Sequence, residues 1–200
     1  MKIKIIRHSE RLDFTKPLYW LMHIGSYWAD SPLTTNGYKM ARDKGVKMVT
    51  NDFDPRYIYS SPYNRTLATS TEINASFPPS KIIIEPLLAE HQPSYKHTIG
   101  LYPNGIPTTY NGQETIFSYP ETYDNFVKRV HFIIYNLIEK NNNDFIIVTH
   151  GEVVKVFVNH IQSLYPQLII DPGSTPYLTT LSFEFDKDRG TILPGSVKIE

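Results

Sequence analysis

Cysteine is absent from the 200 residues of this chain. Disulfide bonds and catalysis by a thiol are therefore excluded, and the chain suits a reducing compartment. Long apolar runs are absent too, because no stretch has the length of a signal peptide or of a membrane-spanning helix. We therefore expect a soluble cytoplasmic protein that makes no contact with a membrane.

A net charge is also lacking, because 20 Lys and Arg side chains are balanced by 20 Asp and Glu side chains. Proteins that bind nucleic acid carry a broad basic surface, so DNA and RNA are not expected partners. A recognised set of metal ligands is missing as well: neither His8 with Glu10 nor His91 with His97 supplies one. We expect no metal and no cofactor, and a metal-dependent hydrolase is a minor alternative.

The length of the chain sets the scale of the fold, since 200 residues can bury a full core within one domain. We predict a single α/β domain over residues 1–200. Fourteen Tyr and fifteen Pro are many for this length, and a large share of them falls between Pro86 and Tyr123. We interpret that concentration as an irregular insertion at about 91–119.

The most informative stretch lies at the start of the chain. Residues 3–6 are mostly isoleucine, which is typical of a strand that is covered on both faces. Such sheets bind ligands beyond the carboxyl ends of their strands, and Arg7 and His8 stand at that end, with Arg11 close behind. Buried arginines are rare unless an anion pairs with them. This cluster therefore predicts a phosphate site.

The other elements follow from hydrophobic periodicity and from capping residues. Segment 9–32 shows no sustained period and is predicted to be a long loop with at most one turn of helix. We expect helices at about 34–49, 65–75 and 121–140 and after Gly151, strands at 57–60, 81–84 and 145–148, and an antiparallel pair at 177–185 and 191–198. The apolar face of the first of these helices is predicted to consist of Met40, Ala41, Val46 and Val49.

A second histidine repeats the arrangement at His8. The strand at 145–148 ends in Thr149-His150-Gly151, so two strands from opposite ends of the chain each present a histidine at the carboxyl edge of the sheet. Arg65 falls in the first turn of a predicted helix, where the helix dipole disfavours a cation unless an anion is bound beside it. The alternative is that both histidines are satisfied residues at strand ends and that Arg65 extends into solvent.

Four segments together resemble the histidine phosphatase superfamily, also called the phosphoglycerate-mutase-like family. Arg7-His8 with Glu10 resembles its Arg-His-Gly-Glu opening, although Ser9 replaces the glycine. Ser31 to Gly37 resembles its Leu-Thr-x-x-Gly segment, Ser60 to Arg65 resembles its Ser-Ser-Pro-x-x-Arg segment, and Val148 to Gly151 matches its second histidine motif. Four motifs in this order make coincidence improbable. The resemblance implies a three-layer α/β/α sandwich with a mostly parallel central sheet.

Within the superfamily, Glu10-Arg11-Leu12-Asp13 is most similar to one branch, which contains the T-cell ubiquitin ligand type tyrosine phosphatases and the ecdysteroid-phosphate phosphatases. In that branch the last glutamate of a Glu-Pro-x-x-x-Glu segment serves as the acid, and residues 85–90 have that form. The resemblance therefore implies Glu90 as the acid, with Glu85, Glu10 and Glu114 as the neighbouring candidates. His91 is expected to face solvent.

The activity implied is the hydrolysis of phosphate monoesters through a covalent phosphohistidine at His8, which replaces one difficult step by two easier ones. The phosphoryl oxygens would be held by Arg7, Arg65, His150 and Arg11, and Glu90 would transfer protons.

The predicted insertion contains several tyrosines and only Lys96 as a lysine or arginine. This composition favours aryl phosphates, phosphotyrosine included, so the expected partner is a phosphorylated small molecule or a phosphotyrosine protein. A phosphoglycerate mutase, a sugar-phosphate phosphatase and a phosphate-binding module without turnover are the alternatives, and a homodimer is left open.

Overall fold

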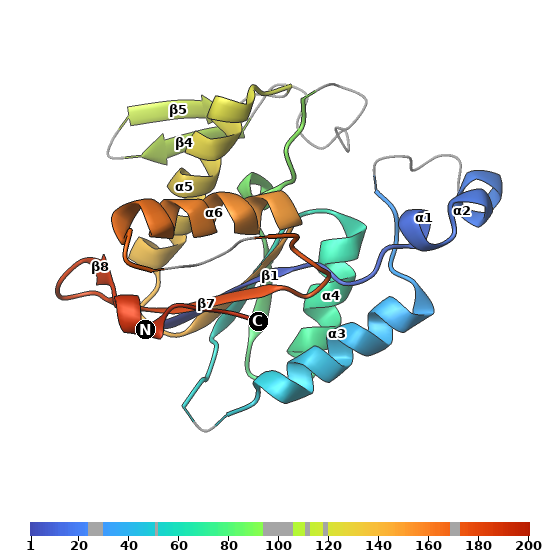
Figure 1. The fold of residues 1–200 in the computed structure, drawn as a ribbon, viewed down its shortest axis with the longest axis horizontal. Coiled ribbons are helices and arrows are strands. Elements are labelled where there is room, and N and C mark those ends of the chain that lie inside the picture. The colour runs from blue at the N-terminus through green and yellow to red at the C-terminus, as the bar shows by residue number, and fades with distance from the viewer. Residues whose placement is uncertain (24–29, 51, 94–105, 111–112, 118–119, 169–172) are drawn as a thin grey trace.

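The computed structural model of the protein describes residues 1–23, 30–50, 52–93, 106–110, 113–117, 120–168 and 173–200. Its centre is a seven-stranded sheet with the order β3-β2-β6-β1-β7-β8, in which β9 also pairs with β7 (Figure 1). The strands are β1 (Lys2–Arg7), β2 (Tyr57–Ser60), β3 (Lys81–Ile84), β6 (Phe145–Thr149), β7 (Thr180–Asp186), β8 (Thr191–Ile192) and β9 (Lys198–Ile199). Strands β1, β2, β3 and β6 run parallel, and β7 runs antiparallel to β1. The prediction of a mostly parallel central sheet is confirmed.

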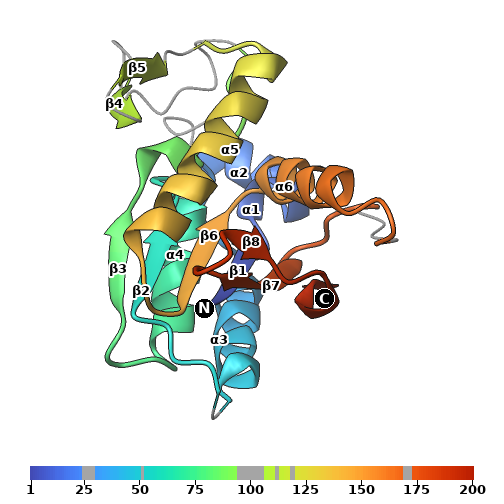
Figure 2. The same ribbon diagram turned by 90° about the vertical axis from the view of Figure 1, so that its left-hand side faces the viewer.

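Helices cover both faces of this sheet and complete three layers (Figure 2). On one face lie α3 (Thr35–Met48) and α4 (Asn64–Asn74), and on the other lie α5 (Tyr123–Lys140) and α6 (Gly151–Leu164). The predicted bounds of α3, α4 and α5 agree with these to within two residues. No helix in the described ranges has the length and hydropathy that crossing a membrane requires.

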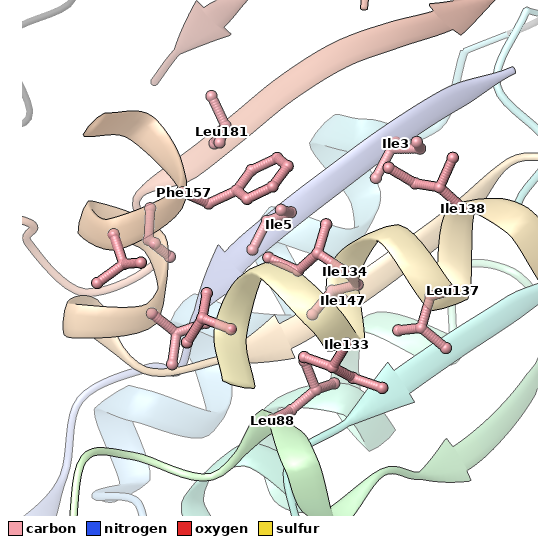
Figure 3. Packing of buried hydrophobic residues seen from close by; sticks show 14 of the residues in the cluster. Ile3, Ile5, Leu88, Ile133, Ile134, Leu137, Ile138, Ile147, Phe157 and Leu181 are labelled. Atoms are coloured by element: carbon pink, nitrogen blue, oxygen red, sulfur yellow. The ribbon is translucent and has the colours of Figure 1, made fainter. Parts of the chain in front are cut away.

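The isoleucines of β1 explain why one sheet carries a core on each side. Successive side chains of a strand point to opposite faces, so Ile5 joins the cluster under α5 and α6, whereas Ile6 joins the cluster under α3 and α4. Figure 3 shows Ile5 beside Ile134 of α5 and Phe157 of α6. The carboxyl edge of β1 is thereby fixed from both sides.

The predicted apolar face of α3 is wrong in part. Its buried residues are Gly37, Ala41, Gly45 and Met48, whereas Val46 and Val49 are exposed. The reason is close packing rather than hydrophobicity: a Cβ at Gly45 would lie 2.9 Å from Ser76 Oγ and 3.1 Å from the backbone of Ile73. Helix α3 therefore approaches α4 most closely at Gly45.

Two segments that were predicted to be irregular contain regular structure. Segment 9–32 holds two short helices, α1 (Leu12–Thr15) and α2 (Pro17–His23). In the 91–119 stretch, β4 (Ile106–Tyr110) and β5 (Gln113–Phe117) form an antiparallel hairpin. Lys96 and the tyrosines at 95, 102 and 119 lie outside the described residues. At the other end of the chain, the expected antiparallel closure is present, because β8 and β9 both pair with β7.

Candidate active site

The order of the strands brings four chain segments together at the carboxyl edge of the sheet. His8 follows β1 and His150 follows β6, and these strands pair in parallel so that Arg7 lies opposite Thr149. Arg65 follows β2 in the first turn of α4. Glu90 follows β3 and the short 3₁₀ helix η1 (Pro86–Leu88). Because the sheet order is β3-β2-β6-β1, the four side chains reach one site from neighbouring strands.

His8 is held as a neutral ring with a defined tautomer. Its side chain is buried, and Nδ1 lies 2.7 Å from the carbonyl oxygen of Ser9. A carbonyl only accepts a hydrogen bond, so Nδ1 carries the proton and Nε2 keeps its lone pair. Burial, with the nearby charge of Arg65, lowers the pKa of His8 well below its usual value. The ring is therefore an unprotonated base and nucleophile at neutral pH.

His150 is neutral for the same reasons. Burial first, then the charges of Arg65 and other cations, lowers its pKa well below the usual value. An Arg65 guanidinium nitrogen lies 3.2 Å from Nδ1, and Ser61 Oγ lies 2.8 Å from Nε2. A guanidinium only donates, so Nδ1 accepts and Nε2 donates to Ser61. The two imidazole rings meet edge to face with their centroids 5.5 Å apart.

Arg65 is buried and joins the two sides of the site. One of its terminal nitrogens lies 2.6 Å from Glu90 Oε2, and the other lies 3.6 Å from Asp30 Oδ1. Glu90 Oε2 in turn lies 3.7 Å from His150 Nδ1. The ring of Tyr63 covers the guanidinium at 4.1 Å. A cation at a helix start is thus matched by carboxylates, and one of them is the acid that the sequence resemblance nominates.

Arg7 reaches the site from the side of His8. Its guanidinium donates to the Thr175 carbonyl and stacks over Tyr177 at 4.6 Å, and Nε is buried with no hydrogen-bond partner within the described ranges. Gly151 makes room for it, because a Cβ there would lie 2.7 Å from Thr175 Oγ1 and 3.3 Å from Arg7 Nε. A side chain after His150 would thus collide with Thr175, whose carbonyl holds Arg7, and would crowd Arg7 itself.

Comparisons with known proteins agree with this arrangement. Residues 4–194 match the model of the histidine phosphatase superfamily, branch 1. The chain belongs to this superfamily. It is 60% identical over 200 residues to an uncharacterized phosphoglycerate mutase family protein of Acanthamoeba polyphaga mimivirus, covering 100% of this chain and 98% of the relative.

The fold of this chain is also found in solved structures. The ecdysone phosphate phosphatase of Bombyx mori, in complex with tungstate, has a TM-score of 0.66 at 21% identity, covering 96% of this chain and 91% of that one. A phosphoglycerate mutase of Bacillus anthracis has a TM-score of 0.61 at 17% identity, covering 100% and 91%. At such identities the similarity shows the fold alone.

Arg11 forms a local ion pair beside the site. Its guanidinium binds Asp13 through two hydrogen bonds of 2.7 and 2.5 Å and stacks on Phe14 at 4.4 Å. Its charge contributes to the lowered pKa of both His8 and His150, so it lies within electrostatic range of the site. Direct contact of Arg11 with a phosphoryl group stays a prediction.

Ser9 fits the position that carries glycine in the family motif. Its hydroxyl donates to the Gly37 carbonyl at 2.7 Å, and its amide donates to Thr69 Oγ1 at 3.0 Å. Ser9 is not among the described residues with positive φ, so the backbone is not strained. Gly37 is itself required, because a Cβ there would lie 2.4 Å from the Glu10 carbonyl oxygen. The serine side chain therefore adds a hydrogen bond to Gly37, while the backbone carbonyl of Ser9 still contacts His8 Nδ1.

The other candidate acids are engaged elsewhere. Glu85 accepts from the Leu87 amide at 3.0 Å and caps η1, and burial raises its pKa. Glu10 accepts from Thr34 Oγ1 at 2.5 Å. The side chain of Glu114 lies outside the described residues. Glu90 is thus the candidate that the described structure brings to the histidines.

Four residues of the site were missed by sequence reasoning: Ser61, Tyr63, Asp30 and Tyr177. Ser61 and Tyr63 lie within the Ser60–Arg65 motif, so the motif itself was the signal. Asp30 and Tyr177 come from irregular segments and had no signal. His91, which was expected to face solvent, is only partly exposed, because its ring stacks on Phe126 at 5.0 Å and its Nε2 is buried.

Proposed function

We propose that this protein is a metal-independent phosphomonoesterase that forms a phosphohistidine at His8. The observation that supports this most strongly is the hydrogen bond from His8 Nδ1 to the Ser9 carbonyl at 2.7 Å. It leaves the Nε2 lone pair available in a ring that burial keeps neutral. A neutral imidazole fixed in this tautomer is prepared to attack phosphorus.

Each step of the proposed reaction uses a group at the sheet edge. A phosphate monoester monoanion that binds Arg65 and Arg7 displaces the Glu90 carboxylate from the Arg65 guanidinium, and Glu90 takes the proton of that monoanion. His8 Nε2 forms a bond to phosphorus, the bond from phosphorus to the ester oxygen breaks, and the Glu90 carboxyl gives that oxygen its proton. Water then attacks phosphorus, gives a proton to Glu90 and breaks the bond to His8. The arginines stabilise the charge on the phosphoryl oxygens, and His150 adds to this when its Nε2–H turns from Ser61 Oγ to a phosphoryl oxygen.

The preferred substrate in this proposal is an aryl phosphate, phosphotyrosine included. A phosphoglycerate needs a second cation for its carboxylate, and the charge of Arg11 is already neutralised by Asp13. Aromatic rings of Phe14 and Tyr177 lie against the site arginines instead. Such faces contribute contact area without charge. Phosphoglycerate mutase and sugar-phosphate phosphatase activities are the alternatives.

The test is hydrolysis of 4-nitrophenyl phosphate with excess chelator, for the parent and for His8→Ala. We expect the parent to be active and the variant inactive. Rapid quenching should trap a phosphoenzyme that is stable to alkali and labile to acid in the parent alone. His131→Gln is the matched control, because it removes a histidine between α5 and α6, away from the sheet edge, and should retain full activity.

Retained turnover in His8→Ala, or complete loss of parental activity on chelation, would refute the mechanism. Phosphate binding without any turnover in the parent would favour the binding module. Side-by-side values of kcat/KM for phosphotyrosine, 3-phosphoglycerate and fructose bisphosphate test the substrate class. A clear preference for either of the last two would refute the aryl assignment while leaving the phosphohistidine intact.

A further inference from the structure

A second buried arginine lies behind the proposed acid. Arg129 projects from α5, is fully buried and binds Glu121 through two hydrogen bonds, 2.9 Å from Nε to Oε2 and 2.5 Å from Nη2 to Oε1. An ion pair in such a place is not a general means of stabilisation, because desolvation offsets much of its attraction. Its remaining contacts show what it does.

The remaining N–H groups of Arg129 point at the backbone that leads to Glu90. Nη1 lies 2.6 Å from the Leu87 carbonyl oxygen and 3.0 Å from that of Ala89, and Nη2 lies 3.5 Å from that of Glu90. The one carbonyl between them, at Leu88, accepts from Thr149 Oγ1 at 2.7 Å. Four successive carbonyls are therefore fixed by side chains from α5 and β6. In Figure 3 the side chain of Leu88 lies beside Ile133 of α5.

Glu121 holds the chain just after Glu90, through two hydrogen bonds to the backbone of Gln92. Its amide donates to the Gln92 carbonyl at 3.0 Å, and its Oε1 accepts from the Gln92 amide at 3.4 Å. The Gln92 side chain donates to the Tyr63 hydroxyl at 3.1 Å. The Tyr63 ring in turn contacts His150 and Arg65, at 4.9 and 4.1 Å. The backbone is therefore held by hydrogen bonds both before Glu90, at residues 87–89, and after it, at Gln92.

We infer that Arg129 and Glu121 form a positioning pair that holds residues 87–90 so that the Glu90 carboxylate lies at Arg65 and His150. The inference rests on the proposed function, in which Glu90 transfers the proton of the leaving group. Neither Arg129 nor Glu121 touches the substrate. A displacement of about 1 Å at a reacting group costs up to about a hundredfold in rate, so the backbone clamp has a measurable effect.

The experiment compares two esters of similar shape, phenyl phosphate and 2,4-dinitrophenyl phosphate. Only the first has a leaving group that needs a proton. Arg129→Lys keeps the charge but loses the fork that reaches several carbonyls. It should lower kcat/KM for phenyl phosphate by about ten- to a hundredfold and for the dinitrophenyl ester by less than about threefold.

Two further variants serve as references, one for loss of the acid and one for loss of stability. Glu90→Gln removes the acid itself and should lower kcat/KM for phenyl phosphate by about two to four decades. Ile138→Ala removes a buried side chain from the far end of the same helix, so it controls for loss of stability. It should change both esters by the same factor.

A second measurement does not depend on turnover. Hydrogen exchange of the peptide covering residues 86–92 should accelerate in Arg129→Lys and remain unchanged in Ile138→Ala. Equal slowing of the two esters in Arg129→Lys, or unchanged exchange in that peptide, overturns the positioning role. A parent inactive toward both esters would overturn the proposed function instead, and the exchange data alone would then decide whether the clamp exists.

Discussion

The two buried arginines, Arg65 and Arg129, differ in the exposure of their partners. Their own exposure is the same to within a percent, at 1% and 0%. The side chain of Glu121, which binds Arg129, is 2% exposed, whereas that of Glu90, which binds Arg65, is 32% exposed. The ion pair of Arg129 with Glu121 is shielded from water, whereas the Glu90 side of the pair with Arg65 is exposed to water.

This difference decides what each cation can do. A charge whose counterion is enclosed cannot exchange partners, since separating the pair leaves an uncompensated buried charge. A charge whose counterion reaches solvent can exchange it for a phosphoryl group. Burial of an arginine alone therefore does not identify a binding site, and the exposure of its partner separates the structural pair from the functional one.

The largest loss of stability is expected when Arg129 is replaced. Arg129→Met leaves Glu121 buried without its partner and should reduce the free energy of unfolding by about 3 to 5 kcal/mol. Urea unfolding followed by circular dichroism measures this loss. The control is Arg42→Met, which breaks an exposed pair with Glu72 and should cost less than about 1 kcal/mol. Similar losses in both variants would contradict the enclosed character of the Arg129 pair.

The opposite outcome is expected at Arg65. Arg65→Met removes a donor for the phosphoryl oxygens and should lower kcat/KM for 4-nitrophenyl phosphate by roughly two to three decades. Its unfolding free energy should fall less than that of Arg129→Met, because Glu90 can turn toward water. Steady-state kinetics and urea unfolding of the two variants, measured together, decide this. An Arg65 variant that keeps its activity but unfolds more easily would reverse the assignment.

A smaller effect is expected at Ser9, which adjoins the proposed nucleophile His8 and is hydrogen-bonded to Gly37 and Thr69. Ser9→Gly loses the hydrogen bond to Gly37 and gains backbone freedom, so the unfolding free energy should fall by about 1 to 2 kcal/mol. Turnover should stay within about threefold of the parent, because the His8 contact to the residue 9 carbonyl is made by the backbone. A large gain in turnover would show that the serine misplaces His8.

The smallest effect is expected at a second pair of histidines. His131 and His160 lie between α5 and α6 with ring centroids 4.2 Å apart. Burial, with the neighbouring His160, lowers the pKa of His131 to about 4. The unfolded chain then binds more protons than the folded one between this value and the usual value near 6.5. Stability is therefore complete above pH of about 6.5 and is lost as pH falls toward 4.

The variant His131→Gln tests this assignment. The urea midpoint of the parent should fall between pH 7 and pH 4.5, and the fall should be shallower in the variant. The change will be modest, since both rings are only half-buried and water screens their charges. His8 and His150 contribute to the slope in both proteins. An identical slope would remove His131 from the acid response.

The sequence predicts the parts of the site that follow directly from strand ends. His8 and His150 each end an apolar run, and parallel strands carry such residues to one edge whatever their order. Arg65 was found through its unusual place in a helical turn. These signals are local in the sequence, so they can be recognised without knowledge of the tertiary fold.

The remaining features depend on contacts that periodicity does not encode. The sequence did not predict that Arg11 forms an ion pair with Asp13, two residues away. The burial of α3 depends on how closely α4 approaches Gly45. The contact of Arg65 with Asp30 depends on where a loop returns to the sheet, and the amino-acid types of that loop do not determine this.

The backbone contact between Gln92 and Glu121 has a consequence for how the molecule can vary. Residues 93–120 leave and re-enter the fold at two points joined by a hydrogen bond of 3.0 Å. The entropy cost of closing a chain segment grows only with the logarithm of its length, by about 0.6 kcal/mol per doubling. Segments of very different size can therefore be exchanged between the same two residues while the sheet edge keeps its geometry. Under the proposed function, the choice of ester could then change with this segment while the groups proposed to act on phosphorus stay in place.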